Sequence, residues 1–243
     1  MATPQGTPSS QPQPSMLEDR PSGILDTQPN RAPLRSLPEI MLSRHHVAAF
    51  APDPVPDDVL ESILKLGLWA PSDFNLQPWR FIVVRDPAQR HLLMRAAADH
   101  TVVGEAPVVI IALGLAEAWR RTMDAIFATD ALLGELDPDE LEDRKQRAEA
   151  FMTTQDPAVW LTRQTMVAVT QMVLAAEAYG LGTALVEQFD PDVIRREFDI
   201  PDEGEVVVLL ALGRAVDVPP PRPARFTVDA VVFRDRFGAP WSP

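Results

Sequence analysis

Residues 70–81 read APSDFNLQPWRF and connect an apolar helix to a strand-forming run. Pro71 ends the helix, because proline cannot continue a helical hydrogen-bond ladder. Four side chains with hydrogen-bonding groups follow: Ser72, Asp73, Asn75 and Gln77. A loop that presents hydroxyl and amide groups between a helix and a strand is suited to holding a flat polar ligand. The alternative is a well-packed turn, in which Phe74 and Trp79 belong to the core and the amides satisfy the turn backbone.

The composition excludes several classes of function. The 243 residues carry a formal net charge of −13, and so acidic a surface repels nucleic acid and anionic membranes. There is no cysteine, which excludes disulfides, thiolate catalysis and cysteine-ligated metal centres. No apolar run reaches the roughly 18 residues of a membrane span, and the N-terminus lacks a basic-then-apolar signal pattern. We therefore expect a cytoplasmic protein with no nucleic-acid or membrane partner.

The chain divides into a tail and one domain. Residues 1–38 are rich in Pro, Gln, Ser and Thr, and such a segment buries too little apolar surface to offset its ordering entropy. We expect this segment to be a mobile tail. The chain is 46% hydrophobic, enough for one substantial core, which we place in residues 39–243.

Helical and strand patterns are mixed along this domain without strict alternation. Helical patterns cover residues 56–70, 86–98, 116–151 (with a break near Asp137 and Pro138), 157–179 and 191–198. Strand-forming runs cover residues 81–84, 107–114, 183–186 and 206–212. The runs PVVIIALG (107–114) and VVVLLAL (206–212) are apolar on both faces, as in the centre of a sheet. The order predicts an α+β fold, a mixed sheet flanked by helices.

The helical pattern 157–179 is apolar nearly all round, which predicts burial in the core or between subunits. Tyr179, the only tyrosine, ends this helix, and we interpret it as structural. Trp119, Met123 and Phe127 recur at helical spacing, and we expect them to pack in a core. Lining a substrate pocket is the alternative for these three side chains.

A basic segment, SRHHVAAF (43–50), precedes the first helix of the domain. Arg44 is suited to a bidentate contact with a phosphate group, and His45 and His46 can donate hydrogen bonds even when neutral. The alternative is a surface arginine with two partly buried histidines. A metal site is disfavoured, because no cluster of carboxylates and further histidines accompanies this pair in the sequence.

Two later segments complete the set of candidates. Glu187 and Gln188 follow the strand 183–186, where backbone N–H groups are free to face a ligand. A plain strand end with Asp190 capping the next helix explains them equally well. Arg222 and Arg225 lie in a proline-rich stretch and could close over a phosphate, or they are ordinary solvated arginines.

Taken in order, these segments resemble the nitroreductase family. The resemblance rests on the basic segment followed by FAPDPVPDDVLESILKLGLWAPSDFNLQPWRF (50–81), and it extends from about residue 40 to the C-terminus. It implies an α+β fold with a mixed, largely antiparallel central sheet. It also implies an entwined homodimer with FMN at the interface, in which residues 214–243 pack on the partner subunit.

The resemblance assigns cofactor contacts and no catalytic residue. It places Arg44, His45 and His46 near the FMN phosphate and ribityl chain; Pro71, Ser72, Asp73 and Asn75 along the cofactor, from the other subunit; Glu187 and Gln188 over the ring edge; and Arg222 and Arg225 at the phosphate. No metal is implied.

Several positions depart from the family pattern. Ala48 stands where arginine or lysine is common beside flavin N1 and O2, where reduced flavin is anionic. Losing that cation makes reduction less favourable by about 1–4 kcal/mol in a partly buried site, unless Arg163 or Arg214 replaces it. The other departures are His46 for serine, Asp73 for a second serine, Gln188 for glycine and Ala224 for a basic residue.

The family activity implies that NADH or NADPH gives hydride to FMN and leaves before a nitroaromatic, a quinone or a similar acceptor binds. One alternative keeps the fold and FMN but changes the reaction to reductive dehalogenation, flavin fragmentation or azoline dehydrogenation. A further alternative is a non-catalytic flavin-binding protein, for which Ala48 and the tail are the motivation.

Overall fold

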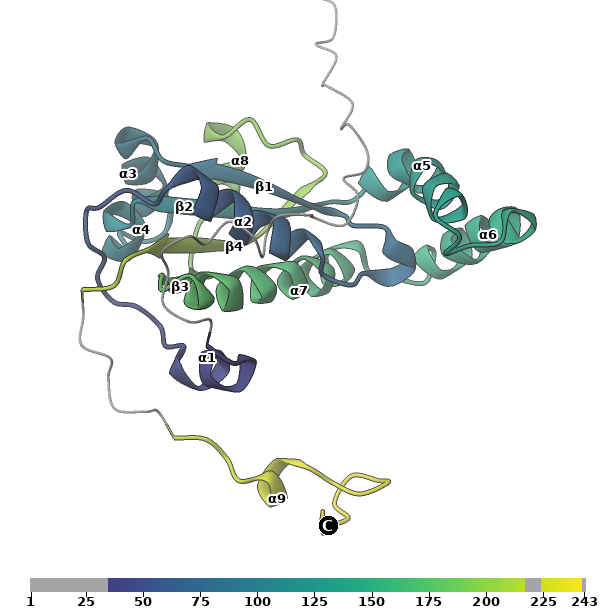
Figure 1. The fold of residues 1–243 in the computed structure, drawn as a ribbon. Coiled ribbons are helices and arrows are strands. Elements are labelled where there is room, and N and C mark those ends of the chain that lie inside the picture. The colour runs from purple at the N-terminus through teal and green to yellow at the C-terminus, as the bar shows by residue number, and fades with distance from the viewer. Residues whose placement is uncertain (1–34, 217–223, 242–243) are drawn as a thin grey trace, which may run out of the picture.

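The computed structural model describes residues 35–216 and 224–241 (Figure 1). Its centre is a four-stranded sheet in the order β1-β2-β4-β3, and every strand pair is antiparallel. The strands are β1 Trp79–Val84, β2 Val108–Leu115, β3 Gly182–Val186 and β4 Gly204–Gly213. The predicted α+β fold with a largely antiparallel sheet is confirmed.

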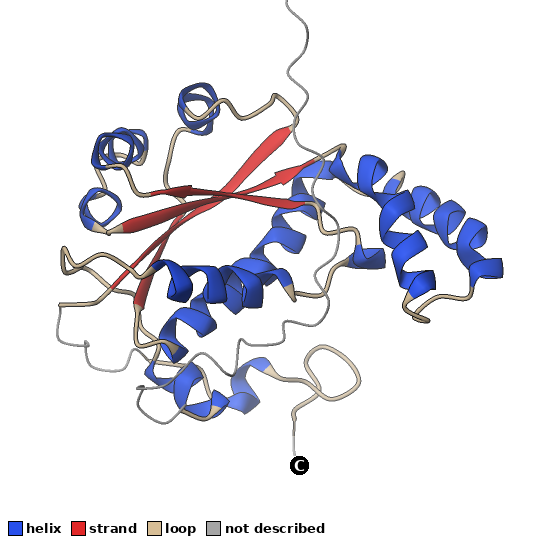
Figure 2. Ribbon diagram, turned by 45° about the horizontal axis from the view of Figure 1, so that its top comes forward, coloured by secondary structure: helices blue, strands red, loops and turns tan. Residues whose placement is uncertain are grey.

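The apolar run of β2 explains why helices cover both faces of the sheet. Successive side chains of a strand point to opposite faces. Val108 and Ile110 belong to the cluster beneath α2 (Asp57–Leu68) and α7 (Pro157–Ala178). Val109 and Ile111 belong to the cluster beneath α3 (Pro87–Ala96), α4 (Thr101–Glu105) and α8 (Pro191–Glu197). Figure 2 shows these two helix layers on either side of the strands.

A helical extension projects from one end of the sheet (Figure 1). It consists of α5 (Ala118–Leu132), the 3₁₀ turn η2 (Pro138–Glu140) and α6 (Leu141–Met152). The predicted break near Pro138 is confirmed, because the Asp137 side chain caps η2 there. Trp119, Met123 and Phe127 are buried in the separate core of this extension, so the prediction that they pack in a core is confirmed.

The periphery holds elements that the sequence analysis did not predict. Helix α1 (Leu37–Ser43) begins at a capping box, in which the Glu39 carboxylate accepts from Ser36 N–H at 2.7 Å. Helix α4 was also missed, because it is only five residues long. The 3₁₀ turn η1 (Asp73–Asn75) follows α2, and α9 (Val228–Val231) lies away from the sheet (Figure 1). No helix within the described ranges is long and apolar enough to cross a membrane.

Gly67 sets the approach of α2 to α7. A Cβ atom added at Gly67 would lie 2.4 Å from Cγ of Met172. We therefore expect Gly67→Ala to lower the free energy of unfolding by about 1–3 kcal/mol, measured by urea denaturation. The loss should be smaller in a Met172→Ala background, where the clashing side chain is removed. Equal losses in the two backgrounds would show that this contact does not limit the packing of the helices.

Candidate functional site

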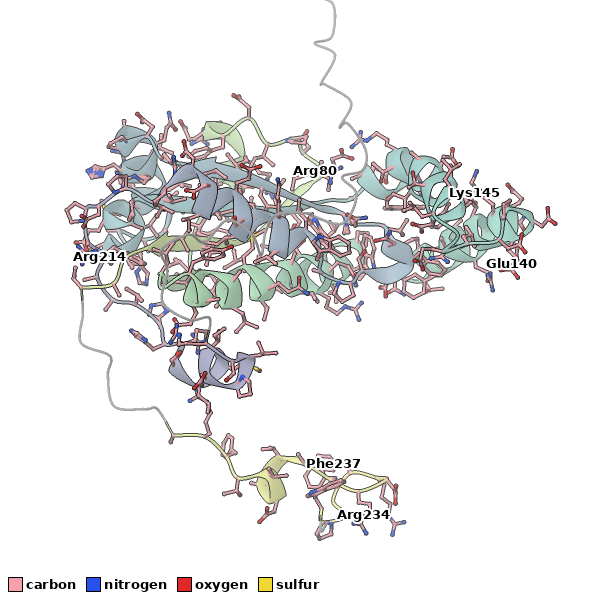
Figure 3. The ribbon with its side chains drawn as sticks, viewed as in Figure 1. Arg80, Glu140, Lys145, Arg214, Arg234 and Phe237 are labelled. Atoms are coloured by element: carbon pink, nitrogen blue, oxygen red, sulfur yellow. The ribbon has the colours of Figure 1, made fainter. Side chains whose placement is uncertain are left out.

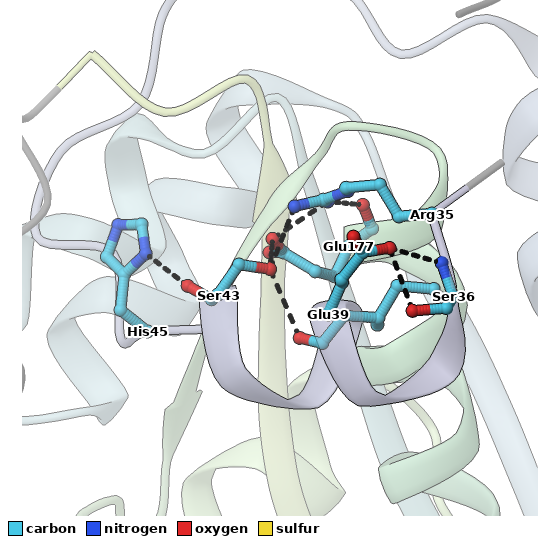
Figure 4. Close-up of polar contacts among 7 residues, drawn as sticks. Arg35, Ser36, Glu39, Ser43, His45 and Glu177 are labelled. Carbon is cyan, nitrogen blue, oxygen red and sulfur yellow. Dashed lines mark hydrogen bonds and ion pairs between the residues drawn. The ribbon is translucent and has the colours of Figure 1, made fainter. Parts of the chain in front are cut away.

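The basic segment lies beside the start of β3. Val47 N–H donates to the carbonyl oxygen of Thr183 at 3.1 Å, and His46 forms an isolated parallel bridge with Thr183. Ser43 at the end of α1 donates through its hydroxyl to Glu177 of α7 at 2.7 Å (Figure 4). The segment is therefore fixed both to the sheet and to the C-terminal end of α7.

The side chains of Arg44 and His45 in this segment have polar groups that are available to bind a ligand. The guanidinium group of Arg44 makes no hydrogen bond or ion pair to any described residue, although its side chain is half-buried. His45 has Nδ1 3.4 Å from the carbonyl oxygen of Ser43 (Figure 4). Its Nε2 is buried and has no hydrogen-bond partner within the described ranges. A buried donor without a partner fits a ligand that accepts hydrogen bonds, such as a phosphate oxygen.

The candidates that follow β3 lie at the opposite end of this strand. Glu187 and Gln188 are exposed, and no described residue accepts a hydrogen bond from their backbone N–H groups. The four steps from Thr183 to Glu187 span about 13 Å at about 3.3 Å per residue. One edge of the sheet therefore offers the Arg44 guanidinium group and the His45 ring at one end and free backbone donors at the other.

The loop after α2 is held by α7. Asp73 N–H donates to Oε1 of Gln164 at 2.9 Å. The Asp73 carboxylate in turn accepts from Trp160 Nε1 at 2.9 Å and from Gln164 Nε2 at 3.0 Å. Ser72 Oγ accepts from Gln77 N–H at 3.1 Å. The side chains of Ser72 and Asp73 are therefore engaged in holding the loop.

The loop and the basic segment are far apart within one chain. They contact α7 at Gln164 and at Glu177, and these positions are about 20 Å apart at about 1.5 Å per residue. Figure 3 shows the same separation: Arg80, just after the loop, and Arg214, which follows β4, lie at opposite ends of the sheet. The structure of one chain thus brings the basic segment and β3 together, but not the loop with Pro71 and Asn75.

The remaining predicted cations are placed as follows. Arg222 lies outside the described residues. Arg225 is exposed, precedes α9 and donates to the carbonyl oxygen of Ala224 at 2.9 Å. Arg214, a candidate replacement for the missing cation at Ala48, donates to Asp53 at 2.5 Å. Arg163, the other candidate replacement, donates to the side chain of Gln155 at 3.1 Å.

Three residues near the loop were missed by the sequence analysis. Trp160 and Gln164 both donate hydrogen bonds to Asp73. The sequence signal for this pair is that the two residues are four positions apart, which puts both side chains on one face of α7. Arg80 donates to the carbonyl oxygens of Gln77 at 3.3 Å and of Trp79 at 2.6 Å. Burial lowers the pKa of Arg80, and the nearby Arg121 acts in the same direction.

The helical extension contacts the same loop. Phe74 packs against Phe151 of α6 with ring centroids 5.6 Å apart, and Asn75 Nδ2 lies 3.5 Å from Asp130 of α5. Burial raises the pKa of the Asp130 carboxyl, and the guanidinium of Arg144 at 4.0 Å opposes that shift. A small hollow of about 90 Å³ lies beside these contacts and includes Trp119 and Trp160 in its lining.

Comparison with known proteins finds a matching family model and related sequences. The sequence model of the nitroreductase family matches residues 41–214. The chain is 36% identical over 176 residues to an NADH dehydrogenase of Thermus thermophilus, and the match covers 71% of this chain and 83% of the relative. It is 30% identical over 195 residues to a 5,6-dimethylbenzimidazole synthase of Rhodobacter capsulatus, and the match covers 73% of this chain and 83% of the relative.

Solved structures show the same fold. A nitroreductase-like protein from Streptococcus mutans superposes with a TM-score of 0.75 at 23% identity, covering 82% of this chain and 97% of that one. A protein from Exiguobacterium sibiricum, assigned as a nitroreductase and solved in complex with FMN, gives a TM-score of 0.74 at 23% identity. That match covers 83% of this chain and 98% of the other.

The partly buried position of Asp130 generates a pH prediction. Because its pKa is higher in the folded state than the unfolded value of about 3.9, the folded state binds the proton more tightly. This contribution to stability is fully present below about pH 4 and is lost as the pH rises through the folded pKa. The melting temperature of the wild type should therefore fall relative to that of Asp130→Asn between pH 4 and pH 7. Asp139→Asn, at an exposed position of η2, is the control and should show no such trend.

Proposed function

The chain belongs to the nitroreductase family of oxidoreductases, and we propose that it binds FMN between two copies of itself. With this FMN, the protein would use NADH or NADPH to reduce a small acceptor such as a nitroaromatic or a quinone. When bound, FMN supplies the redox chemistry, taking up a hydride and passing electrons to the acceptor. The observation that carries the proposal is the family match combined with the donors available at both ends of β3.

Arg44 and His45 would hold the phosphate. The unpaired guanidinium and the buried Nε2 atom provide the charge and the hydrogen-bond donor that a dianion requires. His46 is fixed through its backbone to β3, so it would lie along the ribityl chain. Arg222 and Arg225 are proposed to approach the same phosphate from the segment that precedes α9.

Glu187 and Gln188 would contact the ring through their backbone N–H groups. Such donors suit the electron-rich N5 and O4 edge of a flavin and need no particular side chain. Glutamine in place of glycine at residue 188 is therefore compatible with this role. No side chain is required as a general acid or base, so the proposed site contains cofactor ligands and no catalytic residue.

A second copy of the chain would supply Pro71, Ser72, Asp73 and Asn75, because the loop lies too far from Arg44 within one chain. Exposed apolar side chains beside this loop support a dimer. Leu68 and Trp69 at the end of α2 are 47% and 56% exposed, although an aromatic side chain of this size is usually covered. Phe226 and Phe237 of the C-terminal segment are 83% and 92% exposed, and we propose that this segment packs on the partner.

Anaerobic titration of the purified protein with each nicotinamide tests the proposal. We expect a yellow protein whose absorbance near the flavin bands bleaches on addition of NADH or NADPH and returns when menadione or nitrofurazone is added. The nicotinamide that bleaches the flavin at lower concentration is the natural reductant. A colourless protein that cannot be reconstituted with FMN would refute the proposal.

A second candidate function is a reaction on the flavin itself. The identity to the R. capsulatus 5,6-dimethylbenzimidazole synthase favours it, because that product and the flavin ring share a dimethylbenzene unit. Ala48 is also compatible with it, since a slowly reduced site is less suited to rapid turnover with acceptors. Chromatography of aerobic mixtures containing reduced FMN would separate the two candidates: a dimethylbenzimidazole product supports the second, and unchanged FMN supports the first.

Arg44→Ala should weaken FMN binding by about 10- to 100-fold, because a charge-assisted contact to the phosphate is lost. Riboflavin lacks the phosphate, so its affinity should stay within about twofold of the wild-type value; quenching of flavin fluorescence measures both. Arg95→Ala, at an exposed arginine of α3, is the matched control and should leave both affinities unchanged. Equal losses for FMN and riboflavin would place Arg44 away from the phosphate.

A further inference from the structure

We infer that Asp73, Trp160 and Gln164 form a clamp that holds the 72–77 loop in its ligand-binding conformation before any ligand arrives, with Trp160 and Gln164 acting as positioning residues. This inference deepens the proposed function, because the loop is the part of the proposed FMN site that the partner subunit would supply. We call these three residues the clamp.

The loop needs such a support because its backbone is strained. Phe74, Asn75 and Gln77 have φ values of +51°, +59° and +45°, in the left-handed region that residues other than glycine rarely adopt. Three such residues within four positions disfavour the observed shape of an isolated loop. Hydrogen bonds within the loop, such as that from Gln77 N–H to Ser72 Oγ, offset part of this cost, and contacts with α7 are positioned to offset more of it.

The clamp supplies these interactions at the first residue of the strained turn. The Gln164 amide pairs with Asp73 twice, accepting from its backbone N–H and donating to its carboxylate. Trp160 Nε1 donates to the same carboxylate oxygen, Oδ2, so one side chain of the loop is joined to two successive turns of α7. Hydrogen bonds to an ionised acceptor are stronger than neutral ones, which makes an aspartate more effective here than a serine.

The clamp also places hydrogen-bond donors against the negatively charged carboxylate of Asp73. Two donors are directed at Oδ2, and they disperse the charge of a carboxylate that would otherwise repel an anionic ligand. An aspartate in place of the serine common in the family is thus tolerated in a loop proposed to contact FMN. The clamp joins residues 87 and 91 positions apart in the chain, so no local sequence rule detects it.

Trp160→Phe removes the indole donor but keeps an aromatic ring in the core. In the unliganded variant we expect amide hydrogen exchange of residues 72–77 to be about tenfold faster, and we expect the Kd for FMN to rise about tenfold. Trp119→Phe is the matched control: Trp119 is buried in the same cluster, and its ring nitrogen donates to no described residue. It should leave exchange in the loop and the Kd unchanged.

Gln164→Glu provides a test that a loss of folding cannot imitate. At pH 8 the new carboxylate would face that of Asp73, so the loop should open and FMN should bind about 30-fold more weakly. Two such carboxylates share a proton at low pH, which restores the donor, and affinity should recover towards the wild-type value near pH 5. Gln171→Glu, two turns further along α7, is the matched control and should show no recovery on acidification.

The outcomes separate this inference from the proposed function. Unchanged loop exchange in Trp160→Phe, or the absence of a pH-dependent recovery in Gln164→Glu, would refute the clamp. A wild-type protein that does not bind FMN would refute the proposed function, whereas exchange in the unliganded loop would still decide whether the clamp exists.

Discussion

The 22-residue helix α7 is the constraint on which the arrangement of the site depends. It packs on one face of the sheet through Met172 and Val169, and it carries the attachment points of both candidate ligand segments. Glu177 near its C-terminal end holds α1 and the basic segment, and Gln164 near its N-terminal end holds the loop after α2. Because an α-helix is rigid over this length, the distance between the two segments is fixed by the number of residues between the attachment points.

This fixed distance explains why the proposed site needs two chains. The basic segment lies beside the start of β3, and the backbone N–H groups of Glu187 and Gln188 follow its end, so donors are available at both ends of this strand. The loop lies about 20 Å away along α7, with exposed apolar side chains at the end of α2 beside it. A second copy that covers Leu68 and Trp69 would bury this apolar surface and could bring its own loop to the β3 edge of the first. In the proposed function, dimer formation and a complete ligand site are therefore a single geometric requirement.

Much of the fold could be predicted from the sequence because its signals are local. The apolar run of β2 and the long apolar pattern of α7 arise from burial on both faces or nearly all round, so neither needs knowledge of the partner elements. The break at Pro138 and the helix start at Asp57 follow from local capping rules. Helix α1 could have been found from its S-x-x-E signal, Ser36 to Glu39, but the predicted boundary between tail and domain fell at residue 38, within its first turn.

The organisation of the candidate site could be predicted only in part, for a physical reason. Residue types such as Arg44 and His45 indicate a phosphate contact, but the sequence does not reveal that Arg214 is paired with Asp53. Likewise, the residue type of Asp73 predicts a polar contact in the loop, but the sequence does not reveal that its carboxylate accepts hydrogen bonds from Trp160 and Gln164. Contacts between residues far apart in the chain follow from how α7 lies on the sheet, and no periodicity encodes that placement.

Two departures from the family pattern, Ala48 and Asp73, change the charge of the proposed site in the same direction. Ala48 withdraws a cation from the region proposed to surround the ring, and Asp73 adds an anion to the loop proposed to cover it. Each change disfavours an anionic reduced flavin, and the paired states of Arg163 and Arg214 leave neither guanidinium wholly free to compensate. The clamp moderates this effect by directing two donors at the Asp73 carboxylate, but it does not remove the charge. The proposed site would therefore accept electrons less readily than one with a cation at residue 48, so the reduction potential of bound FMN is the property that these two charge changes should affect.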